Sequence, residues 1–143
     1  MRPRTHLALD RRLCGEPLDV AETAAGTARV GLTTLPEMAA DAEGLVHGGF
    51  LFGLADHAAM LAVNDPRVVL GSAAVRFLRP VAVGDRLIAE ARCAETAGRK
   101  SRVTVEVRRA PAAGGAAGDT VMSGEFVCFT LDRHALTLQA ARA

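Results

Sequence analysis

Aromatic residues are scarce in this sequence. They make up 3% of its 143 residues, and tryptophan and tyrosine are absent. A protein that stacks nucleic-acid bases needs several aromatic side chains on its surface, so this class is disfavoured. The formal net charge of +1 also lacks the strong positive balance of a general nucleic-acid or membrane-surface binder. We therefore expect neither nucleic acid nor a membrane as a partner.

Cysteine motifs, leader sequences and long apolar runs are lacking as well. The three cysteines at 14, 93 and 128 show no CxxC or zinc-ligand spacing, and an odd, scattered set suits a reducing compartment. The first twelve residues have too short an apolar run for a signal peptide. The most hydrophobic stretch, residues 50–63, contains Asp56 and His57 and is too short to span a bilayer. These features predict a cytoplasmic protein.

The common nucleotide-binding and catalytic signatures are missing too. There is no P-loop, no GxGxxG, no GxSxG nucleophile elbow and no HExxH zinc motif. No histidine is clearly placed beside a cysteine for nucleophilic catalysis. The sequence therefore offers no metal site and none of the familiar cofactor sites.

The sequence has enough hydrophobic residues to form the core of one domain. Half of the residues are hydrophobic, and the length is that of one ordinary domain. We predict a single domain over residues 1–143, with an N-terminal helical segment at 1–16 and a C-terminal tail at 132–143. Within the N-terminal segment, residues 6–14 are expected to form a short helix.

Periodicity in the rest of the chain predicts two extended arms, one buried helix and four further strands. Residues 18–34 look extended around a turn, 36–46 form a loop, and 49–64 form a helix that is apolar on nearly every side. From there on the pattern has period two. The expected strands cover 68–81, 86–96, 101–109 and 120–131, with a bulge at Gly124 and a mobile loop at 110–119.

A helix without a polar face must be enclosed. One sheet cannot cover it unless the sheet curls around the helix or a second subunit covers the remainder. We therefore predict an α+β fold in which a strongly curved antiparallel sheet wraps around one long central helix, completed by dimerisation.

Asp56 is a single carboxylate in the apolar middle of this helix. A buried charge is costly unless it is paired, so its presence requires a reason. Its helical neighbours Gly49, Gly53 and Ala59 are small, which leaves room for another molecule to approach the carboxylate. The alternative is a structural role, with Asp56 paired to an arginine or to a neighbouring subunit.

The first turn of the same helix provides a second chemical group. The N–H groups of Gly48 and Gly49 have no intrahelical acceptor, and they favour an oxyanion at the positive end of the helix dipole. Together with Asp56 they suit hydrolysis of an activated acyl group, by direct attack or through a water molecule. His47 either fixes the turn or takes part in catalysis. His57 lies about 100° around the helix from Asp56 and is expected to be a core or interface residue.

Charge is unevenly placed along the chain. The stretch from Arg67 to Arg109 contains nine arginines, Lys100 and four acidic residues, so it carries +6 and the remainder −5. Either these are strands with solvated outer faces, or the segment forms an electropositive rim for an anionic small molecule.

The segment HGGFLFGLADHAAMLAVND, followed by VRFLRPVAVGDRLIAEARCAETAGRKSRVTVEV, resembles the hotdog-fold thioesterase superfamily. The closest likeness is to the branch with the phenylacetate-pathway and mitochondrial acyl-CoA thioesterases. It extends over about residues 18–131 and rests on HGG, a helical carboxylate nine positions after the histidine, and RP, GD and GR at strand ends. The resemblance implies the hotdog fold, an acyl-CoA substrate, and a homodimer or dimer of dimers with sites between subunits.

The resemblance also implies roles for individual residues. Asp56 would be the catalytic carboxylate, and the N–H of Gly48, with Gly49, would polarise the thioester carbonyl. His47 matches the motif histidine, and Asp41 stands where many relatives have an Asn or Gln that positions water or substrate. The CoA phosphates would lie on basic residues at the rim, for which the candidates are Arg79, Arg99 and Lys100.

A second stretch, LFGLADHAAMLAVNDPRVVLGSAAVRFLRPV, is similar to the ligand-sensing domain of the malonyl-CoA-responsive repressor of lipid synthesis. That domain has the same fold without thioesterase catalysis, and the short N-terminal segment here leaves no room for its DNA-binding part. The leading hypothesis is an acyl-CoA thioesterase that needs no metal or cofactor. The alternative is a non-catalytic acyl-CoA-binding or sensor protein, and a dehydratase or hydratase fits the HGG-to-Asp56 spacing less well.

Overall fold

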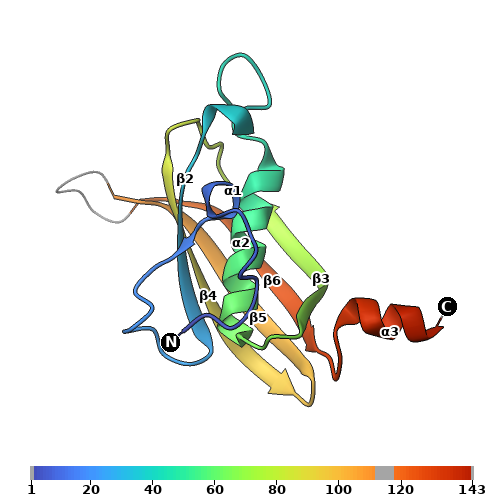
Figure 1. Cartoon of the computed structure of the whole chain (residues 1–143). Coiled ribbons are helices and arrows are strands. Elements are labelled where there is room, and N and C mark those ends of the chain that lie inside the picture. The colour runs from blue at the N-terminus through green and yellow to red at the C-terminus, as the bar shows by residue number, and fades with distance from the viewer. Residues whose placement is uncertain (1, 112–117, 143) are drawn as a thin grey trace.

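The chain folds as one sheet with a long helix lying across it (Figure 1). The computed structural model describes residues 2–111 and 118–142, with side chains described up to residue 139. The expected mobile loop therefore lies largely outside the described residues. The six strands are all antiparallel, in the order β1-β2-β4-β5-β6-β3, which confirms the predicted sheet-and-helix architecture.

The described elements follow the predicted order. The strands are β1 (Glu16–Pro17), β2 (Thr27–Thr33), β3 (Val68–Phe77), β4 (Arg86–Ala97), β5 (Lys100–Arg109) and β6 (Thr120–Thr130). The helices are α1 (Arg11–Cys14), α2 (Gly48–Val63), α3 (Ala135–Arg142) and a short 3-10 turn, η1 (Pro36–Met38).

Helix α2 lies one residue earlier at each end than the predicted 49–64 and has the burial that its sequence predicts. It begins after His47, whose backbone is extended, and ends at Asn64, which adopts the left-handed conformation and donates its N–H to the Met60 carbonyl at 2.8 Å. Nine of its sixteen residues are buried. Because those residues point in several directions around the axis, the sheet and the N-terminal segment must both cover α2.

The inner face of the sheet supplies most of that cover. On β5, Val103, Val105 and Val107 point inward and are buried, as their alternation predicts. Strand β4 contributes buried Leu87 and Ala89 in the same way. The resulting core is aliphatic, with Phe126 as its largest fully buried side chain.

The bulge predicted at Gly124 is wrong. Gly124 pairs regularly with Val75 and Val105, and its missing side chain is needed because a Cβ would lie 2.7 Å from Val75 Cγ1. The register shifts occur elsewhere, at Gly71 on β3, Ala94 on β4 and Val121 on β6. Gly124 thus marks close packing rather than an extra residue, whereas Gly71 does lie at a register shift.

Three other boundaries differ from the prediction. Helix α1 is confined to four residues, since Asp10 caps it by accepting the Arg12 N–H at 2.9 Å, and His6 has a positive φ of 56°. The extended region at 18–34 forms a strand only from Thr27 onward. Strand β3 ends three residues before Pro80, and the predicted C-terminal tail contains helix α3, which no period in the sequence indicated.

One edge of the sheet is long and uncovered. The edge strand β1 has two residues, but the opposite edge strand β3 has ten, and most of its second half is exposed. A long edge strand with free N–H and C=O groups is a template for pairing with another chain. Helix α3 leaves β6 beside this edge and projects away from the body of the molecule (Figure 1).

The N-terminal segment runs along α2 (Figure 1) and is fastened at both ends. Asn64, which is 5% exposed, accepts the Arg4 N–H at 2.7 Å and donates to the Arg2 carbonyl at 2.9 Å. At the other end His57 Nδ1 lies 3.1 Å from the Cys14 carbonyl. His57 is therefore a buried, hydrogen-bonded residue, as expected.

No helix in the described ranges is long and apolar enough to cross a membrane.

We predict that Asn64→Gly lowers the free energy of unfolding by about 1–3 kcal/mol, because glycine keeps the left-handed backbone but loses both side-chain hydrogen bonds. Urea unfolding measures the loss, and hydrogen exchange should show faster exchange across residues 2–14. Asn64→Ala should cost about 1 kcal/mol more, since alanine is strained in this conformation. Stability and exchange equal to wild type in the glycine variant would contradict this role.

Candidate functional site

Asp56 is a half-buried carboxylate without a partner. Its Oδ1 atom is buried and, among the described residues, accepts no hydrogen bond. Burial raises the pKa of Asp56 from 3.8 to about 6. An arginine partner from the same chain, one form of the structural alternative, is absent from the described residues. A carboxyl group with this pKa can accept a proton near neutral pH.

The helix face around Asp56 is open. Gly49 is exposed and Gly53 is half-buried, and a Cβ added at Gly53 would meet no atom within 4 Å. Phe52, one turn before Asp56, packs against Phe126 with ring centroids 5.5 Å apart. Of the three predicted small neighbours, Gly53 leaves open space beside the carboxylate, whereas Ala59 is fully buried and the His47 ring lies against Gly49.

The N-terminus of α2 borders a cavity of about 350 Å³. In the described chain, the N–H groups of Gly48 and Gly49 have no acceptor. The ring of Phe77 lies 3.2 Å from where a Gly48 side chain would begin, so a larger residue there would be tightly packed against this ring. The remaining lining is mainly apolar and consists of Leu45, Val46, Leu51, Leu78, Arg79, Pro80 and Val81.

Gly48 and Asp56 are not brought together within one chain. Asp56 follows Gly48 by eight residues on the same helix, which separates them by about 12 Å along the axis. One carbonyl group cannot contact both. A larger open depression of about 1020 Å³ contains neither residue, and it lies over the charged outer faces of the strands.

His47 and Asp41 lie before α2 with different surroundings. The His47 ring makes no capping hydrogen bond, so a side-chain capping role is wrong, and the exposed ring contacts Phe50 edge-on and covers Gly49. Asp41 Oδ1 accepts the N–H groups of Glu43 and Leu45 at 3.0 and 3.1 Å. Asp41 therefore shapes the loop and does not line the cavity at Gly48.

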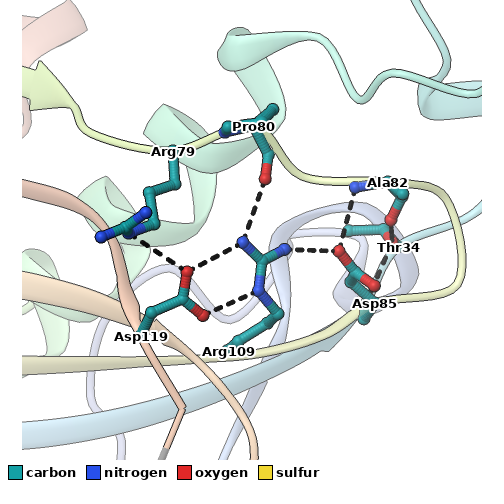
Figure 2. Close-up of polar contacts among 7 residues, drawn as sticks. All are labelled: Thr34, Arg79, Pro80, Ala82, Asp85, Arg109 and Asp119. Carbon is teal, nitrogen blue, oxygen red and sulfur yellow. Dashed lines mark hydrogen bonds and ion pairs between the residues drawn. The ribbon is translucent and has the colours of Figure 1, made fainter.

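Arg79 belongs to an ion-pair network beside the cavity (Figure 2). Its Nε lies 3.4 Å from Asp119 Oδ2. Arg109 binds both oxygens of Asp119, at 2.9 and 3.1 Å, and these hydrogen bonds lower the pKa of Asp119. Arg109 also donates to Asp85 at 2.7 Å and to the Pro80 carbonyl at 3.1 Å. The network joins β5, β6 and the loop after β3.

Arg99 and Lys100 lie at the other end of the molecule. Arg99 lies in the turn between β4 and β5 and Lys100 begins β5, while Arg79 packs near the far end of β5 at Arg109. Arg99 is paired with Asp132. Within one chain, therefore, only Arg79 of the three predicted phosphate-binding residues lies beside Gly48.

The excess of positive charge in the middle of the chain is largely balanced by acidic residues outside it. Asp119 pairs with two of its arginines, Glu125 with Arg102, and Asp132 with Arg99. Charge counted along the sequence overstates the field at the surface because the sheet interleaves strands from both segments.

No three His, Cys, Asp or Glu side chains in the described ranges are grouped to hold a metal ion.

The sequence reasoning missed three residues at this site. Phe77 and Leu78 are 53% and 50% exposed at the cavity mouth, and two consecutive apolar residues at a strand end could have drawn attention to them. Asp119 follows a Gly- and Ala-rich stretch and carries no motif. Only the pairing of β5 with β6 brings it to Arg109.

A family model described as the thioesterase superfamily matches residues 43–116, half of the chain. Among solved structures, PH1136 from Pyrococcus horikoshii is 48% identical with a TM-score of 0.86, covering 95% of this chain and 97% of that one. A mutant of the phenylacetic acid degradation protein PaaI from Thermus thermophilus is 30% identical with a TM-score of 0.68, covering 83% and 95%.

Two curated relatives are longer proteins. Methylthioribose-1-phosphate isomerase from Aquifex aeolicus is 50% identical over 123 residues, which cover 86% of this chain and 25% of that protein. Transcription factor FapR from Shouchella clausii is 34% identical over 70 residues, 49% of this chain and 37% of FapR. The chain thus matches 25% to 37% of the length of these relatives. The family match, the PaaI likeness and the curved sheet around α2 agree, and this chain is a hotdog-fold member of the thioesterase superfamily.

Proposed function

We propose that this protein is an acyl-CoA thioesterase whose active site is shared by two subunits. The observation that carries the proposal is Asp56, a half-buried carboxylate with no partner in the described chain, on a helix face left open by glycines. Burying such a group without a partner destabilises the fold, so a catalytic role would account for its presence. Membership of the thioesterase superfamily supports a thioester as the substrate.

In the proposed reaction the thioester carbonyl accepts a hydrogen bond from the Gly48 N–H, with Gly49 beside it, at the positive end of α2. Asp56 removes a proton from a water molecule, whose oxygen attacks the carbonyl carbon. The C–S bond breaks, and the thiolate of CoA takes the proton from Asp56. Direct attack by Asp56 would instead form an anhydride, which water then hydrolyses to the same acid.

Two features support a site formed by two subunits. First, Gly48 and Asp56 of one chain are about 12 Å apart along α2, so the carboxylate must come from a second copy. Second, β3 is an open edge of ten residues. If two copies join antiparallel through this edge, their α2 helices also run antiparallel. Gly48 then faces Asp56 of the partner subunit when the helices cross near residues 52 and 53, where Gly53 leaves space.

A non-catalytic acyl-CoA-binding protein is the second candidate. The observation that favours it is the position of Asp41, whose carboxylate serves the loop backbone and leaves no amide side chain there to orient water. The similarity to the transcription factor FapR is consistent with this candidate. Measuring acyl-CoA binding alongside thiol release separates the two functions.

We predict that Asp56→Asn lowers thioester hydrolysis by about 10²- to 10⁴-fold, because the variant cannot take up a proton. Release of free thiol from a panel of acyl-CoAs measures the loss, and size-exclusion chromatography with light scattering checks that the assembly is unchanged. Undiminished hydrolysis by the variant would rule out the proposed role of Asp56.

The same substitution should stabilise the protein. The folded-state pKa of Asp56 is raised by burial, so the stability linked to its neutral form is present at low pH and lost as pH rises through about 6. Asparagine stays neutral, and Asp56→Asn should raise the free energy of unfolding by about 1–3 kcal/mol at about pH 8. An Asp56 paired with a cation in the assembly predicts the opposite sign, so urea unfolding distinguishes a catalytic from a structural carboxylate.

We predict that hydrolysis depends on pH through Asp56. Burial places its pKa at about 6, and only the ionised carboxylate accepts a proton or attacks. The value of kcat/KM should therefore be level at neutral pH and fall about tenfold per pH unit below about 6. A rate that stays level down to the ordinary pKa of an aspartate would show that Asp56 does not act in this way.

We expect a dimer in solution that depends on β3. Ala73 and Ala74 are both exposed on this edge strand but alternate between its two faces. Ala73→Lys puts a charge on the side of α2, where the second copy would lie, and should shift the protein toward monomer with its circular dichroism retained. Ala74→Lys puts the same charge on the outer face and is the matched control. Light scattering that reports a wild-type monomer would exclude a shared site.

A further inference from the structure

The guanidinium group of Arg79 lies at the cavity mouth, where it is paired on one edge only. Its Nε faces Asp119 at 3.4 Å, and its two terminal Nη groups have no partner among the described residues. The side chain is 63% exposed. Its backbone is also held, since the N–H groups of Leu78 and Arg79 both donate to the Val121 carbonyl, at 2.8 and 3.3 Å. The free Nη pair forms a fork that suits a phosphate group.

Asp119 is itself fixed by a second arginine (Figure 2). Arg109 spans both of its carboxylate oxygens and is the less exposed arginine, at 28%. A further contact from Arg109 to the Pro80 carbonyl holds the chain immediately after Arg79. Asp119 therefore has one defined orientation, with Oδ2 turned to the Nε edge of Arg79.

We infer that Asp119 is a positioning residue that holds Arg79 ready to bind a phosphate group of CoA at the mouth of the Gly48 cavity. This inference rests on the proposed function, since it assumes a CoA thioester as the ligand. An ordinary exposed ion pair would hold neither partner in place and would leave ligand binding unchanged. Here Arg109 orients the Asp119 carboxylate, which pairs with the Nε edge of Arg79. The two Nη groups of Arg79 therefore stay free to bind a phosphate group.

Free CoA and pantetheine are the probes that isolate this interaction. Both carry the thiol arm, but pantetheine lacks every phosphate group. Arg79→Met removes the charge and leaves the contacts between Arg109 and Asp119 in place, so the variant should fold. Calorimetry should show CoA binding weakened about tenfold in this variant, the scale of one charge-assisted hydrogen bond, with pantetheine binding unchanged.

Asp119→Asn tests the positioning role. It should weaken CoA binding severalfold, less than Arg79→Met, and spare pantetheine. The double variant should bind CoA like Arg79→Met alone, because Asp119 acts only through Arg79. The matched control is Arg102→Met, which removes another exposed arginine paired with two glutamates on the sheet and should change neither affinity.

Four results would overturn the inference. These are unchanged CoA binding in Arg79→Met, equal weakening of CoA and pantetheine, unchanged or tighter CoA binding in Asp119→Asn, and additive effects in the double variant. The binding ratio does not depend on turnover. A wild-type protein that binds CoA but releases no thiol from acyl-CoAs would refute the proposed hydrolysis. The roles of Arg79 and Asp119 would still be decided by the CoA and pantetheine affinities of the variants.

Discussion

The structure depends on enclosing a helix that has no polar face. Helix α2 buries side chains around most of its circumference, and apolar surface of this extent is stable only out of water. The sheet curves around it from one side, and the N-terminal segment, fastened at Asn64 and His57, follows it on another. Most sequence features outside the helix, from the alternating valines of β5 to the alanines of β4, serve this enclosure.

Two polar features of α2 stand out from this apolar core as candidates for a function. The first-turn N–H groups at Gly48 and Gly49 border a cavity, and the carboxylate of Asp56 is half-buried with no partner among the residues that the structure describes. Each is unfavourable or incomplete in a single chain. The Gly48 N–H and the Asp56 carboxylate lie two turns apart on one helix, so no side-chain motion can bring them into contact with one carbonyl group. The open β3 edge provides the physical means by which a second copy could bring the two groups together.

The polar network at Arg109 shows how the wall of that cavity is held. One guanidinium group connects Asp85, Asp119 and the Pro80 carbonyl, and thereby fastens three chain segments at the end of the sheet. The cavity wall formed by Leu78, Arg79 and Pro80 is thus braced by charge rather than by packing alone. Such bracing holds the chain next to Phe77, whose side chain is exposed at the cavity mouth.

The sequence by itself determined the order and kind of the main elements, the buried helix to within one residue at each end, and Asp56 as the candidate catalytic residue. Hydrophobic period and the cost of a buried charge are local properties, which is why the sequence reveals them. The short helix α1 and the position of the bulges escaped it, because capping by Asp10 and close packing at Gly124 depend on particular contacts. Only the tertiary structure decided which arginines carry free charge and which lie near α2. Strand pairing brings Asp119 to Arg79 and separates Arg99 and Lys100 from Gly48, and contacts between residues distant in sequence leave no periodic trace in it.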